Sequence, residues 1–172
     1  IVVNDAAISI GDVNLGDAIT QTYTISNTGS AALDISAVSL SGAHASDYTI
    51  VSAPSTIAVG QSANLQISFA PSAINARTAS VNIASNALNN ANYSFALDGN
   101  GTAALIAVNN SSNQPINNGD TAISFGSVVL GANNTASFTI KNTGNLPLTL
   151  SSSLNGSNAS DFTIVSAPSS IA

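Results

Sequence analysis

The sequence has 172 residues and a formal net charge of −6, with only two basic residues and no cysteine. This balance argues against nucleic acid and anionic membrane surfaces as partners, since both need basic patches, and it excludes disulfides and thiolate metal sites. No apolar run reaches the roughly 18 residues that span a bilayer, so we expect no membrane insertion by this segment, and any export signal would lie outside it.

In chain order, short stretches alternate apolar with small polar residues, which is the period-two pattern of a β-strand with one buried face. Turn-forming residues separate these stretches at intervals of roughly 8 to 13 residues. Two sheets with one dry face each must cover one another, so the pattern predicts all-β, immunoglobulin-like sandwiches of about seven strands. The predicted strands of the first sandwich comprise residues 1–3, 7–11, 23–26, 33–36, 48–51, 65–69, 79–83 and 93–97.

One of these strands recurs later in the chain. It reads YTISNTG at 23–29 and FTIKNTG at 138–144, about 115 residues further on. Each copy ends in Asn-Thr-Gly, which indicates a tight turn in which Gly29 is free to adopt a positive φ angle. Self-similarity at this spacing indicates tandem repeats, so we predict two domains, residues 1–103 and 104–172.

The second repeat follows the first closely over most of its length. Residues 122–126 repeat 7–11, and SDFTIVSAPS at 160–169 repeats SDYTIVSAPS at 46–55. Counterparts of the strands around Ile67, Val81 and Phe95 are absent, so we predict that the second sandwich is incomplete and exposes a sheet edge and an apolar face. Three explanations stay open: a longer repetitive protein, strands supplied by another chain, or partial disorder of the second repeat.

The ordered series of motifs resembles a known family. It runs IxFGxVxxG, FTIxNTG, a Leu-rich strand, SGxxxxD(Y/F)xI, GxxxxLxIxFxP, RxAxVxI and YxFxLxGxG, the last three in the first repeat only. This series resembles the bacterial choice-of-anchor D repeats, relatives of the ASPM-SPD-2-Hydin (ASH) and major-sperm-protein-like immunoglobulin-fold domains. The resemblance implies tandem extracellular modules of large surface, adhesin-like or secreted proteins, and it carries over no catalytic residues.

Few residues offer catalytic chemistry. With one histidine, no cysteine and no glutamate, no nucleophile–base pair has support, so we expect the chain not to be an enzyme. We predict that His44 is an exposed loop residue and that Lys141 faces solvent. Asp47 and Asp161 each precede an aromatic residue, and we predict that their side chains cap a turn.

Calcium is a minority alternative to the expectation that the chain holds no cofactor. Extracellular tandem sandwiches can hold Ca²⁺ at their junctions with oxygen ligands of Asp and Asn. The spacing here lacks the density of dedicated calcium loops, and Asp or Asn before Gly more often marks a turn. The candidate ligands are Asp98, Asn100, Asn118 and Asp120.

The sequence therefore predicts a non-catalytic structural or spacer repeat of an extracellular bacterial surface protein, adhesin stalk or filament, whose partners are neighbouring repeats. One alternative is a self-assembling fibre subunit whose open second repeat is completed by strands from a neighbouring subunit. Another is a carbohydrate- or protein-binding adhesion module. Against sugar stacking, tryptophan is absent, and Tyr23, Tyr48 and Tyr93 occupy core-type positions.

Overall fold

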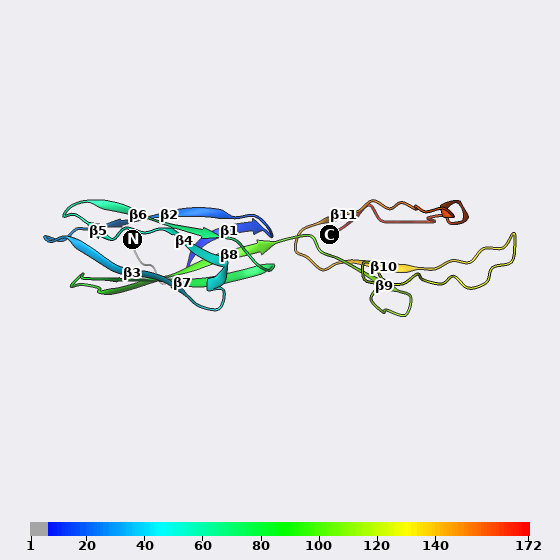
Figure 1. Ribbon diagram of the computed structural model, residues 1–172, viewed down its shortest axis with the longest axis horizontal. Helices are drawn as coiled ribbons and strands as arrows, with labels where there is room; N and C mark the ends of the chain where they lie inside the picture. The colour runs from blue at the N-terminus through cyan, green and yellow to red at the C-terminus, as the bar shows by residue number, and fades with distance from the viewer. Residues whose placement is uncertain (1–6) are drawn as a thin grey trace. The chain divides into compact units, whose positions relative to one another are not determined.

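The computed structural model describes residues 7–172, so the strand predicted for residues 1–3 lies outside the described part. The chain divides into two compact units, Ile1–Ala103 (unit 1) and Ala104–Ala172 (unit 2). Regular structure in residues 7–172 consists of β-strands and two short 3-10 helices, η1 at Ala45–Asp47 and η2 at Ala159–Asp161 (Figure 1). The predicted all-β class is therefore confirmed. Within these residues, no helix has the length and apolar character needed to cross a membrane.

Unit 1 is an immunoglobulin-like sandwich of two sheets that enclose one apolar core (Figure 1). The larger sheet has the strand order β1-β8-β7-β3-β5 and the smaller sheet the order β2-β6-β4. Strands β1 and β8 run parallel, while the other pairs of unit 1 run antiparallel. The strands of unit 1 are β1 (Ile8–Asn14), β2 (Ile19–Ser26), β3 (Leu33–Ser41), β4 (Tyr48–Ser52), β5 (Thr56–Ile57), β6 (Ser62–Phe69), β7 (Asn75–Ser85) and β8 (Asn92–Thr102).

Strand β6 illustrates how the alternation builds the core. Leu65, Ile67 and Phe69 are fully buried, and the polar residues between them are more exposed. From the other sheet, Val81 and Leu97 are also fully buried in the same cluster. Burying a side chain of this size stabilises the fold by about 1.5–3 kcal/mol relative to leaving it exposed. The sandwich therefore rests on a closed core shared by both sheets.

The Asn-Thr-Gly stretch of unit 1 differs from the hairpin turn that the sequence predicts. Strand β2 belongs to the smaller sheet and β3 to the larger, so the connection crosses from one sheet to the other. Gly29 does not adopt a positive φ angle. The expectation about Gly29 was wrong because a connection between sheets does not require the backbone geometry of a two-residue hairpin.

Unit 2 reproduces part of this pattern. Strands β9 and β10 pair antiparallel, as do β11 and β12. In the second pair, Leu148 lies opposite Ile171, just as Leu33 of β3 lies opposite Ile57 of β5. The strands of unit 2 are β9 (Ile106–Asn110), β10 (Phe138–Asn142), β11 (Leu148–Thr149) and β12 (Ser170–Ile171).

Two stretches of unit 2 whose sequences repeat strands of unit 1 do not form strands. Residues 122–126 and 162–165 are irregular, although their sequences match β1 and β4. In unit 1, β1 pairs with β8 and β4 pairs with β6. The described part of unit 2 offers no strand equivalent to β6 or β8, so the backbone groups of these stretches lack ladder partners.

Candidate functional site

Asn27 organises the loop at one end of unit 1. Its side chain is buried, and its Nδ2 donates hydrogen bonds to the carbonyl oxygens of Ala31 at 2.8 Å and Ile57 at 2.9 Å. Its Oδ1 accepts a hydrogen bond from the backbone N–H of Gly29 at 3.0 Å. Because a buried backbone group without a partner costs about 1–3 kcal/mol, this one side chain fixes the path between the two sheets.

Asn142 repeats the arrangement in unit 2. Its Nδ2 donates to the carbonyl oxygen of Leu146 at 2.8 Å, and its Oδ1 accepts from the N–H of Gly144 at 3.0 Å. The backbone of Leu105 adds a further contact, because the N–H of Thr143 donates to its carbonyl oxygen at 2.7 Å. Recurrence of the same hydrogen bonds in both units indicates that the Asn-Thr-Gly motif has a structural role.

A cavity of about 610 Å³ opens beside the Asn27 loop of unit 1. Residues 25–33 and 85–90 line it, together with Ile35, Ile83 and Tyr93. The side chains of Asn86, Asn89 and Asn90 add amide groups to the lining. A volume of this size falls within the range of small-molecule sites, roughly 300–1,000 Å³.

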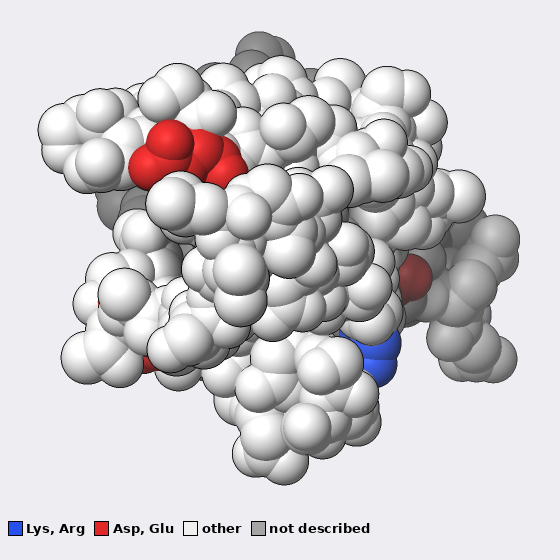
Figure 2. All heavy atoms as spheres, turned by 90° about the vertical axis from the view of Figure 1, so that its right-hand side faces the viewer, with Lys and Arg blue, Asp and Glu red and all other residues white. Residues whose placement is uncertain are grey.

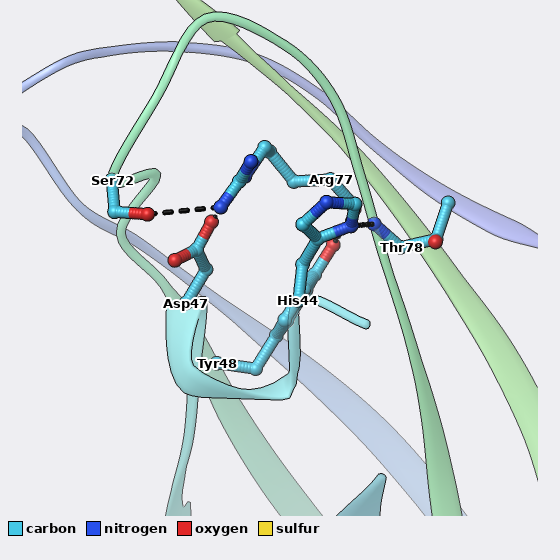
Figure 3. A network of polar contacts seen from close by, with 6 residues as sticks. All are labelled: His44, Asp47, Tyr48, Ser72, Arg77 and Thr78. Atoms are coloured by element: carbon cyan, nitrogen blue, oxygen red, sulfur yellow. Dashed lines mark hydrogen bonds and ion pairs between the residues drawn. The ribbon is translucent and has the colours of Figure 1, made fainter. Parts of the chain in front are cut away.

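The opposite half of unit 1 holds a polar network around one ion pair (Figure 3). The Nε of Arg77 lies 2.5 Å from Oδ2 of Asp47, whose side chain is 1% exposed. The Nη2 of Arg77 donates to the hydroxyl of Ser72 at 2.9 Å, and the hydroxyl of Tyr48 donates to the carbonyl oxygen of Arg77. These contacts join η1, β4 and the start of β7, so the network ties the two sheets together.

The environment shifts two pKa values in this network. Burial of Asp47 favours its neutral form, but hydrogen bonds from Arg77 and Ser72 and the charge of Arg77 outweigh burial and lower the pKa of the Asp47 carboxyl. Burial, with the charges of Asp98 and Asp47 nearby, raises the pKa of Tyr48 to about 12. Asp47 is therefore a carboxylate and Tyr48 a neutral hydrogen-bond donor across the physiological range.

The structure shows the surroundings of Asp47, His44 and Lys141. Asp47 forms an ion pair across the sandwich instead of the predicted turn cap, because the guanidinium of Arg77 lies within reach. His44 is half-buried instead of fully exposed, and its Nδ1 accepts a hydrogen bond from the N–H of Thr78 at 2.9 Å. Lys141 in unit 2 faces solvent, as predicted.

The ion pair between Asp47 and Arg77 was not predicted from the sequence. The one feature that could have indicated it is that the only arginine of the sequence lies in an alternating strand.

The parallel seam between β1 and β8 contains the first two calcium candidates. Asp98 and Asn100 both lie on β8, where Asp98 pairs in register with Ser9 and Asn100 with Asp12. The Nδ2 of Asn100 donates to Oδ1 of Asp12 at 2.8 Å. One further bridge crosses the seam, from the hydroxyl of Thr102 to Oδ1 of Asn14 at 2.8 Å.

The other two calcium candidates lie in a turn of unit 2. The Oδ2 of Asp120 accepts hydrogen bonds from the backbone N–H of Asn117 at 2.7 Å and from its Nδ2 at 3.2 Å. Asn118 lies inside this turn, which Gly119 completes with a positive φ angle of 86°. Across residues 7–172, no three His, Cys, Asp or Glu side chains are grouped so that they could hold a metal ion. The hydrogen bonds that Asp120 accepts from Asn117 are those of a turn.

The surface carries little charge. Figure 2 shows one face on which nearly all atoms belong to uncharged residues, with only isolated acidic and basic positions. The sequence explains this sparsity, because eight aspartates and two basic residues are its only formal charges apart from the termini. Such a surface offers no concentrated field for attracting a charged ligand.

Comparisons with known proteins place the first repeat in a family context. A model of the HYDIN/CFA65/VesB-like family of Ig-like domains matches residues 1–100. No curated protein matches the sequence. Among solved structures, a Porphyromonas gingivalis W83 protein of unknown function is 18% identical with a TM-score of 0.49; the match covers 55% of this chain and 43% of that one.

Two further solved structures are similar to this chain at low identity. The secreted serine protease VesC from Vibrio cholerae is 20% identical with a TM-score of 0.45, over 56% of this chain and 22% of the protease. The ASH/PapD-like domain of human CEP192 is 14% identical with a TM-score of 0.42, over 58% of this chain and 84% of that domain. The match covers less than half of the Porphyromonas and VesC chains.

Proposed function

The chain belongs to the HYDIN/CFA65/VesB-like family of Ig-like domains, and on that premise we propose that it is a non-catalytic structural repeat that carries tension along an extracellular stalk or filament. The family match confirms the relationship to ASH-type immunoglobulin-fold domains that the motifs predict. The proposed setting is a bacterial surface protein in which such units follow one another, with no cofactor. The low charge and the absence of cysteine support this setting. So does the strand pairing of Leu33 with Ile57, which Leu148 and Ile171 repeat in unit 2.

The observation that carries the proposal is the parallel pairing of β1 with β8. Among residues 7–103, β1 is the first strand and β8 the last, and these two strands are hydrogen-bonded neighbours from Ile8 to Asn14. Because they are parallel, a pull on the two ends slides one strand along the other. The ladder hydrogen bonds lie across that direction, so they share the load and must fail together.

Side-chain and loop contacts reinforce the same seam. The bridges from Asn100 to Asp12 and from Thr102 to Asn14 both join β8 to β1. The N–H of Leu15 donates to the carbonyl oxygen of Thr102 at 2.9 Å and extends the pairing beyond the strand. These contacts lie where the chain leaves unit 1, so they resist the first step of sliding.

Single-molecule force spectroscopy tests this role. The absence of cysteine allows one attachment pair, Ala7→Cys with Ala103→Cys, to load the seam in shear. The matched control, Thr28→Cys with Gln61→Cys, pulls at adjacent ends of antiparallel β2 and β6 and opens their hydrogen bonds one after another. We expect a higher unfolding force in the first geometry, because the rate of forced unfolding depends on the barrier along the pulling direction.

The result that contradicts the proposal is equal or lower resistance in the shear geometry. As a second readout, Asp12→Ala combined with Asn14→Ala removes both side-chain bridges, and we expect it to lower the shear force without changing the force in the Thr28/Gln61 geometry. Asn82→Ala on β7, whose side chain contacts Ser41 away from the seam, is the control substitution.

A second candidate function is ligand binding at the cavity beside Asn27. Its apolar lining and amide groups suit a small neutral ligand such as a sugar, or a short peptide segment. Leu88 is fully exposed in the 85–90 loop, where a ligand could cover it. A glycan array followed by NMR titration tests this idea, with shift changes expected at Ala87–Asn90. An absence of glycan hits together with unchanged spectra would remove the sugar-binding candidate.

A further inference from the structure

Asparagine followed by glycine recurs in the chain, and this pair of residues has a chemistry of its own. The sequence contains such pairs at Asn100, Asn118 and Asn155. Because glycine has no side chain, its backbone nitrogen can approach the side-chain carbonyl carbon of the preceding asparagine more closely than that of a bulkier residue. Whether this approach takes place depends on the fold around each pair.

The reaction begins when the backbone nitrogen of the glycine gives up its proton to base and attacks Cγ of the asparagine. A new N–Cγ bond forms, the Cγ–Nδ2 bond breaks, and Nδ2 takes up a proton and leaves as ammonia, so that a cyclic succinimide remains. Water then opens the ring at either carbonyl carbon and gives aspartate or isoaspartate, whose backbone runs through Cγ. The sum is hydrolysis of an amide, with water as the only co-reactant and no change of oxidation state.

Asn118 lies in an exposed turn near the start of unit 2. Both Asn118 and Gly119 are exposed, and Gly119 has a φ angle of 86°. A Cβ atom placed on Gly119 would meet no atom within 4 Å, so the space around its backbone is open. The turn is closed by the N–H of Asp120, which donates to the carbonyl oxygen of Asn117 at 3.1 Å. The nitrogen of Gly119 is therefore free to approach the side chain of Asn118 by rotation within the turn.

Asn100 is enclosed, although the same residue type follows it. It lies in β8, and Gly101 is opposite Val13 of β1 on one side and Asn75 of β7 on the other. Pairing on both sides holds the backbone groups of β8 in the ladder. Gly101 is buried, and a Cβ atom on it would collide with the carbonyl oxygen of Ala73. The backbone at this position therefore has no room to turn towards the side chain of Asn100.

A hydrogen bond also holds the amide of Asn100. Its Nδ2 donates to Oδ1 of Asp12 at 2.8 Å, which directs the side chain across the seam to β1. Attack by the nitrogen of Gly101 requires Cγ to turn back along β8, and this rotation breaks the hydrogen bond. Reaction of Asn100 therefore requires local opening of β8, whereas reaction of Asn118 requires only rotation within an exposed turn.

We propose that Asn118 is a site of spontaneous deamidation in the folded protein, and that the paired strand β8 protects Asn100 from the same reaction. Both asparagines precede glycine, so the difference between their rates reports the fold around them. The proposal does not depend on a load-bearing role of the β1–β8 seam, because protection of Asn100 requires only that β8 stays paired in the absence of force.

Deamidation changes both the charge and the backbone of the turn. Either product places a carboxylate at position 118, close in sequence to that of Asp120, and adds a negative charge to a chain that already carries −6. Isoaspartate also adds a carbon atom to the backbone between Asn117 and Asp120, which changes the spacing of their hydrogen bonds. The start of unit 2 therefore changes in one direction with time, because hydrolysis does not restore the amide.

Timed incubation of the folded chain in mildly alkaline buffer tests the proposal, with mass spectrometry of proteolytic peptides to locate each product. We expect Asn118 to be converted at least roughly tenfold faster than Asn100, because only Asn100 must wait for local opening. A parallel incubation in urea removes the fold, and there we expect the two rates to agree within about threefold.

The matched variant is Asn118→Gln, which keeps the amide but places it one carbon further from the nitrogen of Gly119. We expect it to abolish conversion at position 118 and to leave the slow reaction of Asn100 unchanged. Equal rates at Asn100 and Asn118 in the folded chain would overturn the protection by β8. An unreacted Asn118 in the folded chain, together with conversion in urea, would overturn the modification site.

The amide NMR spectrum supplies a second readout of the same incubation. We expect the signals of residues 117–120 to change as Asn118 reacts, while those of β8 stay in place. If the β8 signals changed at the same rate, unit 1 would be reacting too, and the selectivity that the proposal assigns to the fold would be refuted.

Discussion

The hydroxyl groups of two tyrosines in unit 1 have opposite environments. The hydroxyl of Tyr48 donates a hydrogen bond to the carbonyl oxygen of Arg77. The hydroxyl of Tyr23 is buried and has no hydrogen-bond partner among residues 7–172, and burial raises its pKa. The chain itself carries phenylalanine, Phe138, at the position of Tyr23 in the second repeat. A buried polar group without a partner is a cost that phenylalanine avoids.

We therefore expect Tyr23→Phe to increase the free energy of unfolding of unit 1 by about 1 kcal/mol. Tyr48→Phe removes the hydrogen bond to the partly buried carbonyl oxygen of Arg77, so we expect a loss of about 1–2 kcal/mol. Urea unfolding followed by circular dichroism measures both variants. A Tyr23→Phe protein less stable than the original would mean that its hydroxyl has a partner in solution.

The ion pair of Asp47 should make the stability of unit 1 depend on pH. Because the folded pKa of Asp47 is lowered, its contribution is fully present above the ordinary aspartate pKa of about 3.9 and is lost as pH falls through the folded value. Asp47→Asn should lower stability at pH 7 by about 3 kcal/mol, since it leaves Arg77 without its carboxylate.

The measurement is urea unfolding of both proteins between pH 7 and pH 2. Other aspartates also titrate, so the informative quantity is the difference between the original protein and Asp47→Asn. We expect this difference to be constant above about pH 5 and to shrink below about pH 4. A difference that does not change with pH would show that the carboxylate charge of Asp47 contributes nothing.

At the scale of the strand, β8 contains two glycines, Gly99 and Gly101, at positions where its neighbours leave no room for a side chain. A Cβ atom on Gly99 would lie 2.5 Å from the ring of Phe69, and one on Gly101 would lie 2.0 Å from the carbonyl oxygen of Ala73. We expect Gly101→Ala to destabilise unit 1 by about 3 kcal/mol, because a backbone carbonyl cannot move as a side chain can. Ser94→Ala, on an exposed position of β8, is the control for thermal unfolding. Equal melting temperatures for the two variants would contradict this expectation.

Strand formation in this chain depends on partners as much as on local pattern. The alternation around Leu65 and Phe95 predicts β6 and β8 correctly, because β6 pairs with β2 and β8 pairs with β7 in the folded sheets. The same reasoning fails for residues 122–126 and 162–165, which carry the pattern but have no counterpart of β8 or β6 beside them. A single-sequence pattern reports which face a strand could bury, and only the sheet supplies its hydrogen bonds.

The candidate site likewise contains both local contacts and contacts between residues far apart in the sequence. The hydrogen bonds of Asn27 to Gly29 and of Asp120 to Asn117 are local, within three positions along the chain. The pair of Asp47 with Arg77 joins residues 30 positions apart, and no local rule links them. The seam between β1 and β8 spans 88 positions at its two side-chain bridges, so its parallel pairing could be learned only from the fold.

For the whole chain, trypsin offers a direct comparison of the two units. Its only possible cleavage sites are Arg77 and Lys141. Arg77 lies in β7, between β3 and β8, with its guanidinium held by Asp47. Lys141 lies exposed in β10, which has a single strand neighbour within the described residues. A protease must bind an extended, locally opened segment, and opening costs less where fewer strands hold the chain.

We therefore expect trypsin to cut the folded chain after Lys141 at least roughly tenfold faster than after Arg77. Mass spectrometry of timed digests would show fragments 1–141 and 142–172 first, with unit 1 uncut. Lys141→Gln, which leaves Arg77 as the only site, should make the folded chain nearly resistant. Early cleavage at Arg77 would mean that unit 1 opens as easily as unit 2, and a sandwich that opens so readily could not hold tension through its β1–β8 seam. Protease resistance of unit 1 is thus a requirement of the load-bearing role that can be checked without applying force.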